Sequence, residues 1–65
     1  MLIIAEYTDG TYEPLGQAIN EEEADEIYSS YRVLIYKQEV ERPKAVKLWE
    51  RRARGGFEVV GELRP

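Results

Sequence analysis

The side chains that most often carry out catalysis are missing from this chain, which has 65 residues with no His and no Cys. Their absence excludes a Ser-His-Asp triad, a thiol nucleophile, an imidazole base and a Cys/His metal cluster. The glycine-rich motifs that hold phosphates and dinucleotides are also missing. Catalysis would have to rely on carboxylates, Tyr or Lys, and no nucleophile–base pair is evident. We therefore expect no enzyme activity, no cofactor and no metal.

Carboxylates are concentrated in one short segment, which contains Glu21, Glu22, Glu23, Asp25 and Glu26. Consecutive helical residues point in different directions, so these side chains would not converge on one cation. An acidic first turn beside the positive end of a helix dipole is the simpler interpretation. A further interpretation is that this acidic face mimics nucleic-acid phosphate in the basic groove of an enzyme, although the net charge of −4 is small for that role.

Basic residues are concentrated in the second half of the chain. Residues 1–31 contain eight acidic residues and no Lys or Arg, whereas residues 32–65 contain all nine basic residues and five acidic ones. One basic segment surrounds Trp49 and consists of Arg42, Lys44, Lys47, Arg51, Arg52 and Arg54. Cations beside a stacking ring are typical of single-stranded nucleic-acid platforms. Nucleic-acid binding is thus our alternative hypothesis, and cross-strand pairing with Glu58 and Glu62 is the structural explanation of the same charges.

Trp49 is the residue most typical of a partner-binding surface. Trp and Arg are favoured at the centres of protein interfaces, and Lys47 and Arg51 alternate with Trp49 along the chain. Val60 and Tyr36 complete the partner-binding set that we predict on the helix-free side of a sheet. The structural alternative is that Trp49 belongs to the core.

The elements that would position these residues begin with an apolar strand over Leu2–Tyr7, followed by a turn at Asp9-Gly10. A short edge strand or loop is expected at Thr11–Glu13, because Pro14 and Gly16 disfavour a central strand. A helix is predicted over Asn20–Tyr31, with Asn20 as its cap. Its apolar stripe is Ala24, Ile27, Tyr28 and Tyr31.

Three strands are predicted after the helix, at Arg32–Val40, Ala45–Arg52 and Phe57–Leu63, with a turn at Arg42-Pro43-Lys44. A two-residue loop at Gly55-Gly56 would pair Arg54 with Phe57. That register gathers a core face of Val46, Leu48, Phe57, Val59 and Leu63. It leaves Lys47, Trp49, Arg51, Glu58, Val60 and Glu62 on the other face.

The predicted fold is one α+β domain over residues 1–65. It has a four- to five-stranded, mainly antiparallel sheet with one helix on one face, in the order β(β)αβββ. One helix cannot cover both faces of a sheet, so the second face is expected to be available. Its apolar residues could meet a second copy of the chain in a homodimer or another protein.

The functional hypothesis is a small non-catalytic protein-interaction module that binds through the helix-free sheet face or an edge strand. Its size, acidic helix start and lack of enzyme motifs are in the style of accessory proteins encoded by phages and mobile elements. In that setting an inhibitor or modulator of a host protein is expected. The chain shows no signal-peptide pattern and no apolar run of membrane-spanning length, so we expect a cytoplasmic protein with no membrane partner.

Overall fold

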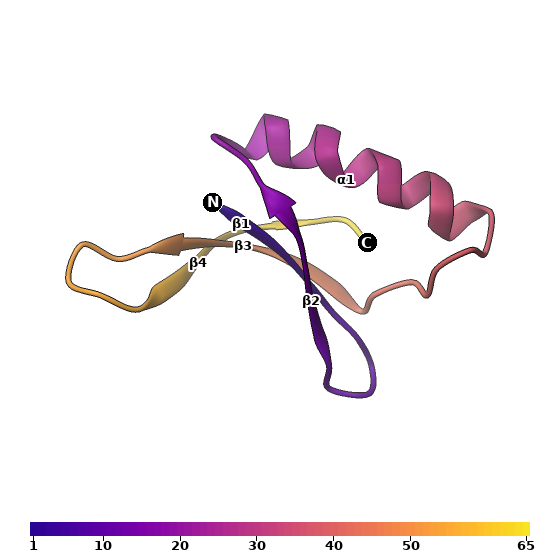
Figure 1. Ribbon diagram of the computed structural model, residues 1–65, viewed down its shortest axis with the longest axis horizontal. Coiled ribbons are helices and arrows are strands. Elements are labelled where there is room, and N and C mark those ends of the chain that lie inside the picture. The colour runs from indigo at the N-terminus through magenta and orange to yellow at the C-terminus, as the bar shows by residue number, and fades with distance from the viewer.

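The computed structural model describes residues 1–65 and has one helix over a four-stranded antiparallel sheet (Figure 1). The strand order in the sheet is β2-β1-β3-β4. This confirms the predicted α+β class with one helix on one face. The elements are β1 (Leu2–Glu6), β2 (Tyr12–Gln17), α1 (Glu21–Tyr36), β3 (Ala45–Arg51) and β4 (Phe57–Leu63).

The turn predicted at Asp9-Gly10 joins β1 to β2. The Gly10 N–H donates to the Tyr7 carbonyl, and the Asp9 carboxylate accepts from both the backbone N–H and the hydroxyl of Thr11. Gly10 has φ +87°, which favours glycine. The prediction of this turn is therefore confirmed. The hydrogen bonds from Thr11 to the Asp9 side chain also stabilise it.

Strand β2 is longer than the Thr11–Glu13 segment that the sequence predicted, and it lies at an edge of the sheet. Pro14 is tolerated there because an edge strand leaves one side of its backbone unpaired. The register shifts between Ile3, paired with Gly16, and Ile4, paired with Pro14, so that Leu15 is an extra residue. This bulge allows the strand to continue past Pro14.

The helix begins as predicted and ends five residues later than predicted. The Asn20 side chain accepts a hydrogen bond from the Glu23 N–H at 2.8 Å, which confirms the cap. The strand predicted over Arg32–Val40 is wrong, because α1 runs to Tyr36. Two strands follow the helix in place of the three in the predicted order.

The physical reason is that the apolar run at residues 33–36 is buried with a helical period. Ile35 lies on the same face of α1 as Ala24 and Tyr28, and all three are buried. Val33 and Tyr36 are 52% and 88% exposed, so they contribute nothing to the core. Docking of one residue per turn thus outweighed the β propensity of Val, Ile and Tyr.

The helix ends in a Schellman motif rather than in a strand. The Gln38 N–H donates to the Ile35 carbonyl, and the Glu39 N–H donates to the Leu34 carbonyl. Gln38 has φ +60°, the only positive φ outside glycine. The turn predicted at Arg42-Pro43-Lys44 is instead part of an irregular connection over residues 37–44, which follows the helix.

The β3–β4 hairpin has a different register from the predicted one. Arg51 pairs with Phe57, so the loop spans residues 52–56 and not Gly55-Gly56 alone. The Arg52 N–H donates to the Gly56 carbonyl, and both loop glycines have positive φ. The prediction of a two-residue loop is wrong, because the Gly55 N–H donates to the Arg52 carbonyl and a further turn therefore precedes Gly56.

A bulge farther along this hairpin makes Leu48 face Gly61 and Trp49 face Val59. A Cβ on Gly61 would lie 3.3 Å from Leu48 Cδ1, so the register places the residue without a side chain at the tightest point. The predicted core members Val46, Leu48 and Leu63 are buried. Phe57 and Val59 are not, and their assignment to the core is wrong.

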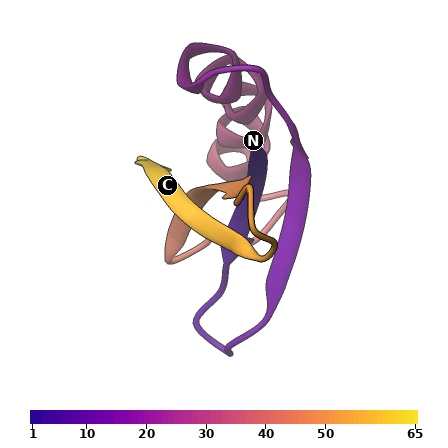
Figure 2. The ribbon, with the colours of Figure 1, turned by 90° about the vertical axis from the view of Figure 1, so that its left-hand side faces the viewer.

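The core lies between α1 and one face of the sheet (Figure 2). Tyr28, Ile3, Leu48 and Val46 are its largest fully buried side chains. The molecule measures 41 × 26 × 15 Å along its principal axes. Figure 1 looks down the 15 Å axis and shows α1 above the sheet, so the helix layer and the sheet layer are stacked along the 26 Å axis. No part of the chain covers the other side of the sheet.

Candidate protein-interaction surface

Alternation along β1 and β3 decides which side chains face away from the helix. Ile3 and Leu48 are paired across the two strands and are buried beneath α1. Their neighbours Leu2 and Trp49 are also paired and point to the opposite side. We call this side the helix-free face, and it contains Leu2, Ile4, Glu6, Tyr12, Lys47, Trp49, Arg51, Phe57, Val59 and Glu62.

The centre of the helix-free face is apolar. Leu2, Ile4, Trp49 and Phe57 line an open hollow of about 290 Å³ in which every lining residue is hydrophobic. Phe57 is 53% exposed, and Val59, which pairs with Trp49, is 45% exposed. Contiguous apolar side chains left in water are a feature of interaction surfaces on small proteins.

Trp49 lies on the helix-free face, as its alternation with Leu48 predicts. Leu2 is its neighbour on β1 and Val59 is its neighbour on β4. The indole is half-buried, and its Nε1–H is shielded from solvent without an acceptor in the chain. The ring therefore presents only carbon surface to the outside.

A partly buried ion pair borders this apolar centre. Lys47 Nζ lies 3.0 Å from Oε2 of Glu6, whose side chain is only 11% exposed. No donor is aligned with Oε2 for a strict hydrogen bond, but the nearby ammonium group compensates the buried carboxylate. The same pairing with Glu6 raises the pKa of Lys47. Glu62 lies opposite Lys47 on β4 and leaves this border with an acidic excess.

One member of the predicted partner-binding set lies elsewhere, and another has no cross-strand partner. Tyr36 ends α1 and not a strand, so its placement beside Trp49 is wrong. Val60 is exposed on β4, but it is the extra residue of the bulge and has no partner on β3. Lys47 and Arg51 both lie on the helix-free face beside Trp49, as predicted.

The surface also has four apolar members that were not predicted from the sequence, which are Leu2, Ile4, Phe57 and Val59. Leu2 and Ile4 could have been predicted. The strand β1 is apolar on both of its sides, and the helix can cover only one of them. Phe57 and Val59 depended on the hairpin register, and neither the bulge nor the wider loop is evident from apolar alternation.

The basic segment of the alternative hypothesis does not form one patch. Lys44 and Arg52 lie at opposite ends of β3, about 26 Å apart at the usual rise of a strand. Arg52 Nε lies 3.6 Å from Glu58 Oε2, and Lys47 is paired with Glu6. Arg42 precedes the strand, and Arg51 and Arg54 lie at its far end, towards the loop.

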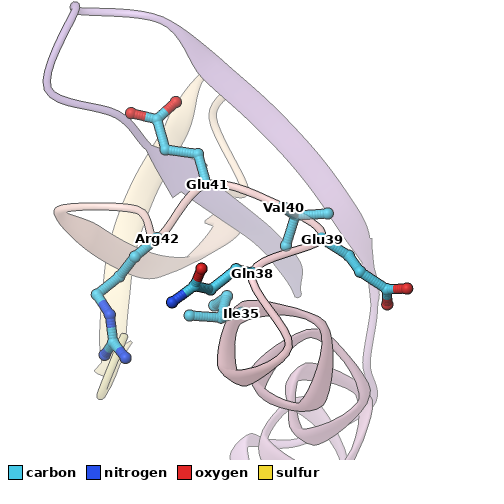
Figure 3. Close-up of a pocket in the computed structure, with 6 residues that line it drawn as sticks. All are labelled: Ile35, Gln38, Glu39, Val40, Glu41 and Arg42. Carbon is cyan, nitrogen blue, oxygen red and sulfur yellow. The ribbon is translucent and has the colours of Figure 1, made fainter.

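A larger hollow of about 480 Å³ lies where α1 leads into β3, and it is open to solvent (Figure 3). Figure 3 shows that the side chains of Glu39, Glu41 and Arg42 point in different directions. They do not converge on a common point, so the hollow has no arrangement suited to acid–base chemistry. The structure also contains no group of three or more carboxylates that could hold a metal ion.

Comparisons with known proteins returned no match to a protein-family model, to a curated protein or to a solved structure. The one helix of the structure lacks the length and apolar character that crossing a membrane requires.

Proposed function

We propose that this protein is a small non-catalytic interaction module and that its helix-free face binds another protein surface. The observation that carries the proposal is the apolar centre of this face around Trp49, on a side of the sheet that the chain leaves uncovered. Half-exposed Phe57 and Val59 extend that centre along β4.

The arrangement matches the anatomy of a protein interface. An aromatic residue lies at the centre, apolar neighbours surround it, and charged residues form the border. The Glu6–Lys47 pair keeps the charges of the border in place, and Arg51 contributes a cation beside Phe57. Burial of the central side chains would supply the free energy of association, and the charges would select the partner.

The proposal extends to the kind of partner, its location and a second point of attachment. A host protein that is inhibited or modulated is the partner expected if a phage or mobile element encodes the chain, and the cytoplasm is the expected place. The outer edge of β4 is a second point of attachment, because β4 is an edge strand without proline. Nucleic-acid binding ranks below protein binding, since its basic residues are dispersed and two of them have acidic neighbours.

The test compares three variants in a pull-down from the cells that express the protein. Trp49→Ala and Phe57→Lys alter the apolar centre, and we expect each to lower recovery of the bound protein at least about tenfold. Tyr36→Ala is the matched control, because it removes an exposed aromatic residue from the end of α1. It should leave recovery unchanged.

Circular dichroism and urea unfolding of each variant separate loss of binding from loss of fold. Phe57→Lys is the critical variant, because its side chain is half-exposed and outside the core. Undiminished recovery with a folded Phe57→Lys variant would contradict the proposal. An equal loss of recovery with Tyr36→Ala would show that the partner binds at the helix.

A further inference from the structure

We infer that the partner of the helix-free face is a second copy of this chain, bound about a two-fold axis that lies between the two sheets and at right angles to the strands. The inference rests on the proposed function and names the partner. One face carries two ends of opposite charge, and it also carries both a projecting ring and a hollow. Two copies of that face can therefore complement each other in charge and in shape.

Charge differs between the two ends of the helix-free face. One end contains Glu6, Lys47 and Glu62, which sum to one negative charge. The other end contains Arg51, beside the loop that carries Arg54 and Arg52, the second of which is paired with Glu58. We call these the acidic end and the basic end. The apolar centre separates them.

Shape differs between the same two ends. Tyr12 lies across from Glu6 at the acidic end and is 65% exposed, so its ring projects from the surface. The apolar hollow bounded by Leu2, Trp49 and Phe57 lies towards the basic end. Glu6 and Leu2 are about 13 Å apart along β1 at the usual rise of a strand. The projecting ring and the hollow are therefore separate features of one face.

A two-fold axis through the apolar centre places the acidic end of each copy over the basic end of the other. Tyr12 of each copy then meets the hollow of the other, and Arg51 meets Glu62. The opposite alignment would place acid against acid and is disfavoured by repulsion. An isologous dimer repeats each favourable contact twice, so that every complementary feature of the face is used.

The size of the chain gives an independent reason for a second copy. Its accessible surface is 4766 Å² at a mass of 7.6 kDa. A monomer of that mass has about 4,300 Å² by the usual scaling, so this chain exposes about a tenth more. Only 11 of 65 residues are buried. Association would add stability to a chain of this size, because its core is small and it has no disulfide.

The test begins with sedimentation velocity of the full chain across micromolar to millimolar concentrations. We expect a species of twice the 7.6 kDa chain mass that dissociates on dilution. Arg51→Glu places acid against Glu62 of the other copy, and Glu62→Arg places base against Arg51. Each variant alone should raise the dimer Kd by about tenfold or more. Both side chains are exposed, so the fold should tolerate each change.

Mixing the two variants provides the decisive measurement. In a mixed dimer both charge contacts become attractive again, so the Arg51→Glu and Glu62→Arg chains should form a heterodimer with a lower Kd than either homodimer has. A tag on one variant identifies that heterodimer by co-purification. Failure of the mixture to associate would overturn the two-fold arrangement, as would a wild-type dimer that neither variant weakens.

A wild-type chain that stays monomeric at millimolar concentration would overturn the second copy as partner. The proposed function is judged separately by the pull-down, since a monomeric chain that captures a different protein through Trp49 and Phe57 satisfies it. A monomer whose pull-down is insensitive to both positions contradicts the proposed function as well.

Discussion

At the scale of single residues, Tyr28 is a core residue with an unpaired polar group. Its side chain is fully buried beneath α1, and its hydroxyl has no hydrogen-bond partner. Burial raises the pKa of Tyr28, while Arg32 and Arg42 act in the opposite direction. The Arg32 guanidinium lies 4.8 Å from the ring centre, so the face of the ring makes a cation–π contact.

We expect Tyr28→Phe to raise the free energy of unfolding by about 1 kcal/mol, because it removes an unpaired polar group and keeps the ring. Urea unfolding at neutral pH measures the change. Tyr31→Phe is the matched control on the same stripe and should have little effect, since Tyr31 is only partly buried. A destabilised Tyr28→Phe variant would mean that the hydroxyl has a partner in solution.

Tyr7 is the residue from which a pH dependence is expected. Its hydroxyl donates to Glu13 Oε2 at 3.0 Å. Burial, together with the hydrogen bond to Glu13 and the charge of Glu13, raises the pKa of Tyr7 from 10.0 to about 12. The folded chain therefore keeps this proton at a pH where the unfolded chain has released it.

The stabilising contribution of neutral Tyr7 is thus complete below about pH 10 and is lost as the pH rises towards 12. Titration of tyrosinate absorbance should show a late step that Tyr7→Phe removes. Glu13→Gln should move that step to lower pH, because the acceptor charge is gone. A late step that Glu13→Gln leaves in place would contradict the pairing.

The C-terminus of α1 is where backbone conformation is most costly at the scale of elements. Gln38 adopts the left-handed conformation that the Schellman motif requires. That conformation is strained by roughly 1–2 kcal/mol for a residue with a Cβ. The helix stops at this point because its stripe has ended and not because a helix breaker is present.

We expect Gln38→Gly to raise the free energy of unfolding by about 0.5–1 kcal/mol, since glycine relieves the strain but costs some chain entropy. Thermal unfolding compares it with Gln38→Ala, which keeps a Cβ and should be close to neutral. Destabilisation by Gln38→Gly would show that α1 does not end in this motif in solution.

The tertiary ties of α1 beyond its apolar stripe are few. Arg32 bonds to the Arg64 carbonyl and pairs with Asp25 at 2.9 Å, so it fastens the helix to the end of β4. These are exposed contacts of modest strength. Retention of the helix therefore depends on the packing of Ala24, Tyr28 and Ile35 against the sheet.

The whole molecule is a two-layer structure with a third layer missing. The β1–β2 and β3–β4 hairpins diverge from the common sheet below the helix (Figure 1). Chains of this length can bury only a small core, and here nearly all of the buried side chains lie between the sheet and the helix. The proposed interaction surface and the small core are thus two consequences of one arrangement. Covering the helix-free face would add the layer that the chain does not supply.

The sequence by itself determined the features that depend on local patterns. Asp9-Gly10, the Asn20 cap and the alternation of Leu48 with Trp49 each lie within a few residues, and each was predictable. The same alternation was enough to put Trp49, Lys47 and Arg51 on the face without the helix. The exclusion of His- and Cys-based chemistry needed only the composition.

Tertiary structure alone decided the features in which two local preferences compete. Residues 33–36 favour strand by propensity and helix by period, and only the docking of Ile35 onto the sheet selects the helix. The register of β4 depends on the fit of Gly61 against Leu48, which no pattern within either strand specifies. Because that register turns Phe57 and Val59 outwards, the apolar extent of the helix-free face is a property of the assembled sheet.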